Sequence, residues 1–340
     1  MIRRPPRSTQ GVSSAASDVY KRQILGCSKF ALEHMLPAMQ LAKNNKCIAI
    51  ATTDISKTKP FLEINKDIKI YLNYNELLND DNVDAVYIPL PNHLHLEWTK
   101  KAILAGKHVL CEKPIALKAN DIDELIKLRD QTGLLVAEAY MIIHHPQWTY
   151  AKQLLQSGAI GNLVQVDGVF SYNNSADINN IRNNSLSGGG GLLDIGVYTF
   201  GSTRFMTNEE PQTISHASII WENKVDVWAH VSAQFQTFNF IGVTSMRMHP
   251  RQEMNFHGSK GLIKLTSPFN PQVFGEAKVH IDTKDGMRKT MKFTTENHYV
   301  NQLEAFSLSI KKGSEYTVSY THLRAHETEA DLVCRLLLEK

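Results

Sequence analysis

Residues 24–39 read ILGCSKFALEHMLPAM, an apolar run, a turn that begins with glycine, and then a helical pattern. Ile24 and Leu25 end a predicted strand, and apolar residues between 32 and 39 recur at the spacing of one helix face. A strand that turns at glycine directly into a helix is the opening of a βαβ unit. This stretch therefore predicts an α/β fold.

The turn GCSKFA is the first candidate binding site. It is a degraded G-x-G-x-x-G pattern, with Gly26 at the first glycine, Ser28 at the second and Ala31 at the third. Such a turn lets the backbone approach a pyrophosphate at a helix N-terminus, although an ordinary strand-to-helix turn also fits the residues. If a dinucleotide binds, we expect contacts from Gly26, Ser28, Lys29, Phe30 and Ala31.

The alternation of strand and helix continues to residue 137. Runs typical of strands at 47–52, 84–88, 107–110 and 134–137 alternate with helical patterns such as 94–104 and 120–129. Short links of this kind predict a doubly wound parallel sheet, a Rossmann domain over residues 24–137. Ligands bind beyond the carboxyl ends of such strands. We therefore expect the glycine turn, residues 91–95 and residues 111–114 to meet at one edge.

From about residue 163 the pattern becomes β-like and antiparallel in style. Apolar residues alternate with polar ones from Val225 to Phe235, and further short runs reach residue 293. This predicts a mostly antiparallel open sheet with one face on a core, in an α+β domain over 138–317. Trp228 and His230 fall on the polar face and suggest an oligomer surface. Four glycines, 188–191, precede a helical insert that ends near residue 205.

Composition excludes several classes of protein. Residues 1–23 carry a net charge of +4 and residues 318–340 carry −1, so the neutral body offers no footprint for nucleic acid. No run of 18 apolar residues exists, so we expect no membrane span. The four cysteines show no CxxC pairing, which is typical of a reducing compartment, and we expect a cytoplasmic protein.

The two ends of the chain look foreign to the fold. Residues 1–23 and 318–340 resemble translated adapter or linker DNA; the alternative is a natural tail and a natural last helix. Residues 1–23 lack the apolar segment of a secretory signal. If the ends are foreign, the first strand has lost its opening residues and the chain folds less well than a native one.

Several motifs together resemble the Gfo/Idh/MocA oxidoreductases. They are EKP at 112–114, DIGVY at 194–198, EAYM at 138–141 and QLEAF at 302–306. The likeness is greatest to the branch of dihydrodiol dehydrogenase and NADP-dependent D-xylose dehydrogenase, and it spans about residues 24–317. It implies an N-terminal Rossmann domain, a second domain with a large open sheet, and a nicotinamide cofactor. It also implies a dimer or tetramer formed through that sheet.

The resemblance implies three catalytic residues, Lys113, Asp194 and Tyr198. Asp194 and Tyr198 are four positions apart and share one helix face. A phenol has an ordinary pKa near 10, which a nearby ammonium lowers. We therefore expect Lys113 to polarise the substrate oxygen and tune Tyr198, which exchanges the proton. Asp194 either binds substrate or holds Lys113.

Further site residues are also implied by the resemblance. Pro91, Asn92 and His95 match a P-N-x-x-H pattern near the nicotinamide, although His95 also fits a plain helix N-terminus. Glu112 is expected at the nicotinamide or its ribose. Arg182 matches a substrate-side D-I-R pattern in which Asn180 replaces the aspartate, or is a surface arginine. His95 and His145 are the remaining substrate candidates, and His144 and His145 fit a cap or pocket wall better than a metal site.

The choice of cofactor depends on residues 52–57. Thr53 stands where NADP enzymes of the branch carry arginine, but Thr52, Thr53 and Lys57 together suit a 2′-phosphate. Asp54 suits the ribose diol of NAD. We expect NADP, with NAD as the alternative, and a sugar or trans-dihydrodiol as substrate. The competing hypothesis is a non-catalytic dinucleotide-binding redox sensor, which needs the glycine turn but not Lys113, Asp194 and Tyr198.

Overall fold

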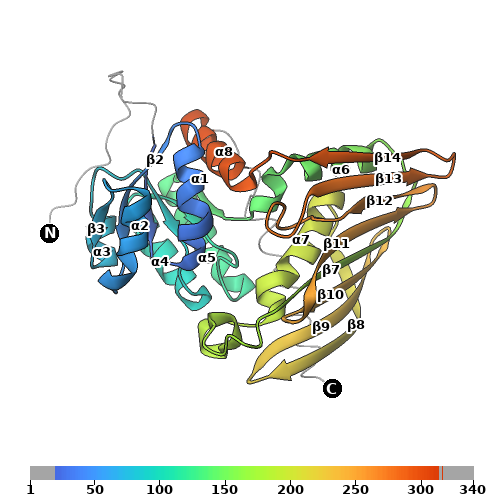
Figure 1. Ribbon diagram of the computed structural model, residues 1–340, viewed down its shortest axis with the longest axis horizontal. Helices are drawn as coiled ribbons and strands as arrows, with labels where there is room; N and C mark the ends of the chain where they lie inside the picture. Colours follow the sequence, from blue (N-terminus) through green and yellow to red (C-terminus); the bar gives the residue numbers. More distant parts are fainter. Residues whose placement is uncertain (1–19, 314–315, 317–340) are drawn as a thin grey trace.

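The computed structural model describes residues 20–313 and 316 of the chain (Figure 1). The first sheet has six parallel strands in the order β3-β2-β1-β4-β5-β6. That order is the one found in dinucleotide-binding sheets, with its switch point between β1 and β4. The strands are β1 (Tyr20–Leu25), β2 (Asn45–Ala51), β3 (Lys69–Tyr71), β4 (Ala85–Ile88), β5 (His108–Cys111) and β6 (Val136–Glu138).

Helices cover this sheet, so its central strands are apolar throughout. All four residues of β4, AVYI, are buried, as parallel strands require when helices cover both of their faces. The glycine turn leads into η1, a π-helical turn that continues as α1. The helical segments are η1 (Ala31–Met35), α1 (Leu36–Leu41), η2 (Ile55–Thr58), α2 (Lys59–Ile64), α3 (Tyr74–Leu78), α4 (Asn92–Leu104) and α5 (Ala119–Thr132).

Strand β1 starts earlier than we expected. Residues 20–23, assigned above to a foreign tail, pair with β2, and Arg22 and Gln23 are fully buried. The Arg22 guanidinium donates to the carbonyl of Leu303 at 3.2 Å and to Ser307 Oγ at 2.7 Å. The end of the tail therefore takes part in the fold, because β1 is a central strand that needs these residues to complete its ladder. Residues 1–19 and 317–340 lie outside the described part.

The second sheet has eight strands in the order β14-β13-β12-β11-β7-β10-β9-β8. Its neighbours are antiparallel except β10 and β7, which run parallel. Figure 1 shows α7 between this sheet and the first domain. The strands are β7 (Leu163–Asn173), β8 (Pro211–Glu222), β9 (Val225–Phe235), β10 (Asn239–Ser245), β11 (Arg247–Gly258), β12 (Gly261–Leu265), β13 (Ala277–Thr283) and β14 (Arg288–Phe293).

Of the remaining helical segments, η3 and α6 connect the first sheet to the second, four lie between β7 and β8, and α8 follows β14. The predicted insert after the glycine run is present as η6 and α7. Helix α8 follows β14 but packs against α1, so the end of the described chain returns to the first domain (Figure 1). These segments are η3 (Met141–His144), α6 (Pro146–Gln156), η4 (Ile181–Asn183), η5 (Ser185–Ser187), η6 (Leu192–Gly196), α7 (Val197–Thr207) and α8 (His298–Lys312).

The predicted alternation in β9 is confirmed. Val227, Ala229 and Val231 are buried, while Trp228 and His230 between them are half-buried on the open face. The predicted fold class, a Rossmann sheet followed by a large, mostly antiparallel sheet, is confirmed as well. None of the described helices combines the length and the apolar character of a membrane span.

Candidate active site

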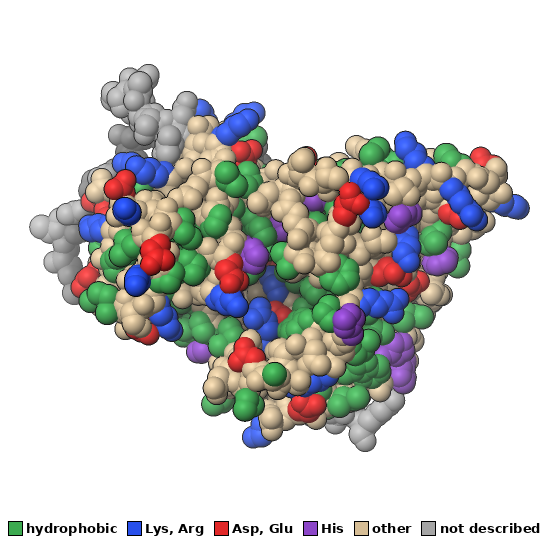
Figure 2. Space-filling model, in the orientation of Figure 1, with side chains coloured by type: hydrophobic (Ala, Val, Ile, Leu, Met, Phe, Trp, Pro, Cys, Tyr) green, Lys and Arg blue, Asp and Glu red, His purple; other side chains and the backbone are tan. Residues whose placement is uncertain are grey.

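The three predicted segments do meet at the carboxyl edge of the first sheet. Gly26 follows β1 and lies against Leu90, which follows β4. The backbone N–H of Glu112, which follows β5, donates to the carbonyl of Ile88 at 3.0 Å. Because parallel strands end together, residues far apart in sequence line one edge here. Figure 2 shows a hollow between the two domains, with basic and acidic side chains inside it.

The glycine turn has the geometry of a phosphate-binding turn. Gly26 has a φ of +124°, and a Cβ atom there would lie 2.7 Å from Leu90 Cδ2. Only glycine fits such a position. Ser28 Oγ accepts from the backbone N–H of Ala31 at 3.0 Å at the start of the helical segment. The turn thus leaves its backbone free to approach a pyrophosphate at a helix start.

The side chains of Lys29 and Phe30, which also belong to the turn, have different surroundings. Lys29 is exposed and pairs with Glu33 at 3.7 Å. The Phe30 ring packs instead on His34 and Tyr299, with a centroid distance of 5.6 Å to Tyr299. A contact from Phe30 to a cofactor is therefore left to its backbone.

Residues 52–54 form a polar turn after β2. The backbone N–H of Asp54 donates to Thr52 Oγ1 at 3.1 Å, and Asp54 Oδ1 accepts from the backbone and hydroxyl of Ser56 at 3.0 and 2.6 Å. Lys57 Nζ lies 4.0 Å from the Asp54 carboxylate, and both side chains are substantially exposed. The aspartate therefore already caps η2, and an ammonium stands beside it.

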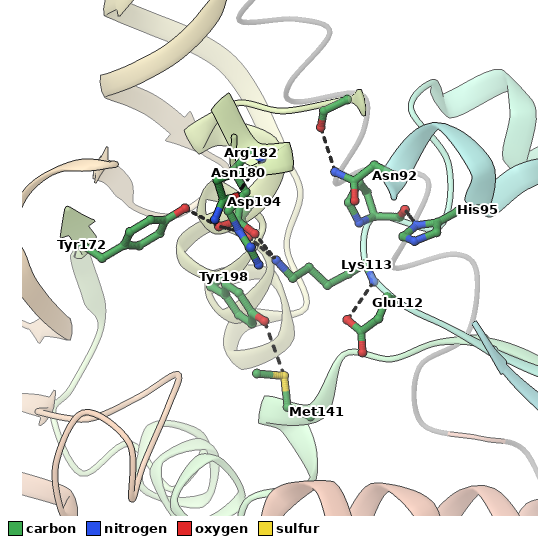
Figure 3. A network of polar contacts seen from close by, with 12 residues as sticks. Asn92, His95, Glu112, Lys113, Met141, Tyr172, Asn180, Arg182, Asp194 and Tyr198 are labelled. Carbon is green, nitrogen blue, oxygen red and sulfur yellow. Dashed lines mark hydrogen bonds and ion pairs between the residues drawn. The ribbon is translucent and has the colours of Figure 1, made fainter. Parts of the chain in front are cut away.

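Lys113 and Asp194 form the centre of the site (Figure 3). Lys113 comes from the turn after β5 and Asp194 from η6, and Lys113 Nζ lies 3.0 Å from Asp194 Oδ1. The same ammonium donates to the main-chain carbonyl of Asp194. Both side chains are nearly buried, at 9% and 12% exposure. Of the two roles expected for Asp194, holding Lys113 is the one seen here.

Asp194 has two more partners. Arg182 Nε lies 2.8 Å from Asp194 Oδ2, and the Tyr172 hydroxyl donates to the same oxygen at 2.7 Å. Burial opposes ionisation of this carboxyl, but Arg182 and Lys113 outweigh burial and place its pKa below the ordinary value. Asp194 is therefore a carboxylate shared between two cations.

Tyr198 lies one helical turn beyond Asp194, but its hydroxyl does not meet the ammonium. Lys113 Nζ sits 4.8 Å from the centroid of the Tyr198 ring, and the hydroxyl donates to Met141 Sδ at 3.5 Å. Burial raises the pKa of Tyr198 well above its ordinary value, and the charges of Glu112 and Asp194 add to this effect. The expectation that Lys113 lowers this pKa is therefore wrong here, because burial of the phenol dominates and the ammonium is directed to Asp194.

Glu112 and Asn92 surround Lys113 on the side of the first domain. Glu112 Oε1 accepts from the Tyr87 hydroxyl at 2.6 Å, and burial raises the pKa of Glu112. The Asn92 amide donates to the carbonyl of Gly188 at 2.8 Å, which joins the start of α4 to the glycine run. Pro91 is the residue before this helix. The loop of the second domain is thus held against the edge of the first.

The structure corrects the roles expected for two histidines. His95 is 1% exposed, and its two ring nitrogens lie 2.6 Å from the carbonyl oxygens of Pro114 and Leu90. It ties two edge loops together and has no nitrogen left for substrate. His145 is fully buried and accepts from the backbone N–H of Gln147 at the start of α6, which is the cap role considered above.

Sequence reasoning missed Tyr172 and Met141 as members of the site. Tyr172 is at the end of β7, and Met141 opens η3, so neither shares an element with Asp194 or Tyr198. Met141 belongs to the EAYM motif, and this motif was the signal in the sequence that could have placed Met141 in the site. No pattern in one sequence pairs Tyr172 with Asp194. Among the described residues, no three histidine, cysteine, aspartate or glutamate side chains are arranged to hold a metal ion.

Both halves of the chain match models of one protein family. Residues 21–140 match the GFO/IDH/MocA oxidoreductase family with an NAD-binding Rossmann fold. Residues 148–264 match the C-terminal domain of the same family.

Individual relatives agree with this match. A dTDP-3,4-didehydro-2,6-dideoxy-alpha-D-glucose 3-reductase from Saccharopolyspora spinosa is 34% identical over 86% of this chain and 87% of its own length. An NADP(+) D-xylose 1-dehydrogenase from Haloferax volcanii is 28% identical over 85% of this chain and 89% of its own. The crystal structure of a 3-ketoreductase from Actinomadura kijaniata in complex with NADP and TDP-benzene superposes with a TM-score of 0.83. That protein is 28% identical over 91% of this chain and 95% of its own.

The family predicted from the motifs is therefore confirmed, and a sugar ketoreductase is more similar to this chain than the xylose dehydrogenase is. The chain belongs to the Gfo/Idh/MocA family of NAD(P)-dependent oxidoreductases.

Proposed function

We propose that the chain reduces and oxidises a sugar carbon with NADP, and that Lys113 and Tyr198 handle the oxygen on that carbon. The observation that carries the proposal is the meeting of Lys113, Asp194 and Tyr198 at the carboxyl edge of the first sheet. The ammonium lies 3.0 Å from Asp194 Oδ1 and 4.8 Å from the centroid of the Tyr198 ring. A dinucleotide-binding protein that only senses redox state has no need of this arrangement.

The residues at this edge fit a nicotinamide dinucleotide. The strand order, the glycine-only position at Gly26 and the helix start at Ala31 provide a place for the pyrophosphate. Gly26 lies at the switch point between β1 and β4, and Lys113 lies in the turn that follows β5, the strand next to β4. When bound, the cofactor supplies or accepts the hydride.

Tyr198 is set to donate a proton. A phenol whose pKa is raised by burial stays protonated at neutral pH, so it suits the general acid that protonates a carbonyl oxygen during reduction. In that direction the carbonyl carbon gains a hydride and the oxygen gains the phenolic proton, which gives an alcohol. In oxidation the same proton returns from the hydroxyl to Tyr198.

Lys113 orients the same oxygen. Its ammonium has three N–H donors, and the structure assigns two of them to the carboxylate and carbonyl of Asp194. The third is left for the oxygen of a substrate. Asp194 thus fixes the direction of Lys113, and Arg182 and Tyr172 fix Asp194.

A sugar or a cyclic diol suits this polar site. The relatives named above act on a dTDP-linked sugar and on D-xylose, as their names state. Arg182 is 41% exposed beside Asp194, so it can hydrogen-bond a second hydroxyl or carbonyl oxygen. The general acid at Tyr198 favours a keto sugar as the substrate that is reduced.

The test is an absorbance assay at 340 nm with a substrate panel. Keto sugars, including dTDP-linked ones, are offered with NADPH, while aldoses, inositols and trans-dihydrodiols are offered with NADP⁺. We expect at least one sugar or diol to give steady turnover that disappears in Lys113→Met and persists in Lys152→Met. Lys152 is a half-buried lysine outside the site that donates to Asn208. Equal turnover in both variants would contradict the proposal.

NADP is the cofactor that the end of β2 favours. The Asp54 carboxylate is engaged by Ser56, and Lys57 and Thr53 stand exposed beside it. An ammonium at this position attracts a 2′-phosphate. We expect kcat/KM to be higher with NADP than with NAD. A tenfold preference for NAD would overturn this assignment.

The open face of the second sheet is the proposed contact between two copies of the chain. Val169 and Val243 are paired at its centre, and Val169 is only 6% exposed although it points to the same side as Val243. Trp228 and His230 extend this face onto β9. An open sheet face with apolar residues at its centre suits a homodimer.

Free thiols at Cys27, Cys47 and Cys111 support a reducing compartment, and we place the enzyme in the cytoplasm.

A further inference from the structure

We propose that Asp226 is a positioning residue for the reaction: its carboxylate fixes the start of the helix that carries Asp194 and Tyr198. The inference rests on the proposed function of those two residues. Asp226 belongs to β9, 32 positions from Asp194 along the chain, and nothing in the motifs of the site points to it.

The carboxylate of Asp226 binds the backbone at the start of η6. The N–H of Leu192 donates to Asp226 Oδ2 at 2.7 Å, and the N–H of Gly191 is a second backbone donor. Asp226 is 5% exposed, so these hydrogen bonds are shielded from water. A carboxylate at a helix start also suits the positive end of the helix dipole.

Asp226 explains why two of the four residues in the glycine run, Gly190 and Gly191, are glycines. A Cβ on Gly190, which has a φ of +125°, would lie 2.3 Å from Asp226 Oδ1. A Cβ on Gly191 would lie 3.1 Å from Asp226 Oδ2. The carboxylate occupies the space that side chains at 190 and 191 would fill. Gly190 and Gly191 therefore make room for one carboxylate at the start of the helix.

The contact leads directly to the ammonium of the site. The N–H of Asp194 donates to the carbonyl of Gly190 at 3.1 Å, and the carbonyl and carboxylate of Asp194 both hold Lys113. Displacing Gly190 and Gly191 moves Asp194, and moving Asp194 moves Lys113. Asp226 itself is held by the β8–β9 hairpin, whose turn at Asn223 and Lys224 has positive φ at both residues.

A negative charge at this place costs stability. Burial raises the pKa of Asp226 to about 7, backbone N–H groups oppose that rise, and the charge of Asp194 adds to it. Asparagine can accept the same hydrogen bond without a buried charge. The position nevertheless carries aspartate. A carboxylate accepts hydrogen bonds from two backbone N–H groups more strongly than an amide does, so a requirement to hold both groups firmly explains this choice.

The experiment compares two variants with a matched control. Asp226→Asn weakens the hold on the helix start. Gly191→Ala leaves the backbone in an allowed helical conformation, with φ −69° and ψ −38°, and presses a methyl group on the carboxylate. Asp282→Asn is the control, because Asp282 in β13 is half-exposed and forms an ion pair with Arg288 of β14, away from the site. Gly191→Ala also serves if Asp226→Asn folds poorly, since alanine favours a helix over glycine.

The first readout needs no substrate. The ¹H–¹⁵N signal of the Lys113 ammonium, assigned by its loss in Lys113→Met, reports whether Asp194 holds it. We expect this signal to shift or broaden in Asp226→Asn and Gly191→Ala and to stay unchanged in Asp282→Asn. An unchanged signal in both test variants would overturn the inference, whatever the activity of the enzyme.

The second readout is turnover with the panel compound that has the highest kcat/KM. We expect kcat to fall at least tenfold in both test variants, with the Kd for NADP within twofold of wild type. In an Asp194→Asn background, Asp226→Asn should cost less than threefold, because the two act through one contact. A lower melting temperature with normal kcat would mean an ordinary helix cap and would refute the inference. Unchanged turnover in Tyr198→Phe would instead refute the proposed function.

Discussion

Asp194 is the residue on which the polar contacts of the site converge. Lys113, Arg182 and Tyr172 come from three separate elements and all reach its side chain. A buried carboxylate is stable only when its charge and lone pairs are met, and here two cations and a hydroxyl meet them. The stability of the site and the direction of the Lys113 ammonium therefore have the same origin.

The sequence predicted the members of this centre better than their contacts. Lys113, Asp194 and Tyr198 were expected together and are together. The sequence could not show whether the Lys113 ammonium reaches the Tyr198 hydroxyl or the Asp194 carboxylate, since both side chains lie on the same helix face. His95 shows the same limit, since the motif does not reveal that the ring is buried between the carbonyl groups of Leu90 and Pro114.

Glu138 leads to a prediction about pH. It is buried, it accepts from the backbone N–H of Ile115 at 2.9 Å, and burial raises its pKa from 4.5 to about 7. Between these values the folded protein holds a proton that the unfolded chain has released, so this group's contribution to the free energy of unfolding falls as the pH rises. Glutamine does not titrate. We expect Glu138→Gln to gain roughly 1–3 kcal/mol relative to wild type between pH 5 and pH 8.

Urea unfolding of both proteins at the two pH values measures this difference. The lowered pKa values of buried histidines act in the opposite sense in both proteins, so they cancel in the comparison. A difference between Glu138→Gln and wild type that does not change with pH would contradict the assignment.

The glycine turn shows how an element places a site. Strand β1 ends and the helical segment begins within a few residues, and this is possible because Gly26 adopts a φ of +124° beside Leu90. The strand-to-helix rhythm was visible in the sequence because apolar periodicity changes from strand to helix spacing. The π-helical turns η1 and η6 were not visible in the sequence, since one extra residue in a helical turn leaves no mark in the apolar pattern.

Gly26→Ala tests this turn, with Gly106→Ala as its matched control. Both residues have positive φ, but a Cβ at Gly26 would lie 2.7 Å from Leu90 Cδ2, and at Gly106 it would meet nothing within 4 Å. Backbone strain alone costs about 1–2 kcal/mol. We expect Gly106→Ala to lose this much stability, Gly26→Ala to lose more because its Cβ also crowds Leu90, and Gly26→Ala alone to weaken NADP binding at least tenfold.

Thermal unfolding and titration of protein fluorescence with NADP measure the two effects. Equal Kd values for NADP in the two alanine variants would show that the turn does not contact the cofactor.

The whole molecule is two sheets joined by helices that cross between them. Helix α8 returns from the second sheet to pack on α1 (Figure 1). The Asn92 amide donates to the carbonyl of Gly188 in the second domain. The order of domains was predictable from where the patterns change. The return of α8 was not, because an amphipathic helix does not reveal which of two apolar surfaces it covers.

The open sheet face predicts a dimer that one substitution can separate. Val243 is half-buried at its centre, paired with His230 and Val169. Val243→Arg places a charge there that the proposed dimer would have to bury. We therefore expect sedimentation velocity to give a dimer for wild type and a monomer for Val243→Arg. Thr290→Arg adds the same charge on the exposed edge strand β14 and should leave the dimer intact. A monomeric wild type, or equal sedimentation of all three proteins, would contradict the proposed interface.

The most direct test of the proton-transfer role is turnover of Tyr198→Phe. Phenylalanine keeps the buried ring and removes the hydroxyl that exchanges the proton. We expect kcat to fall about 10²-fold or more with the Kd for NADP unchanged, while Tyr150→Phe, a half-buried tyrosine in α6, keeps wild-type kcat. A Tyr198→Phe enzyme with the kcat of wild type would contradict the account.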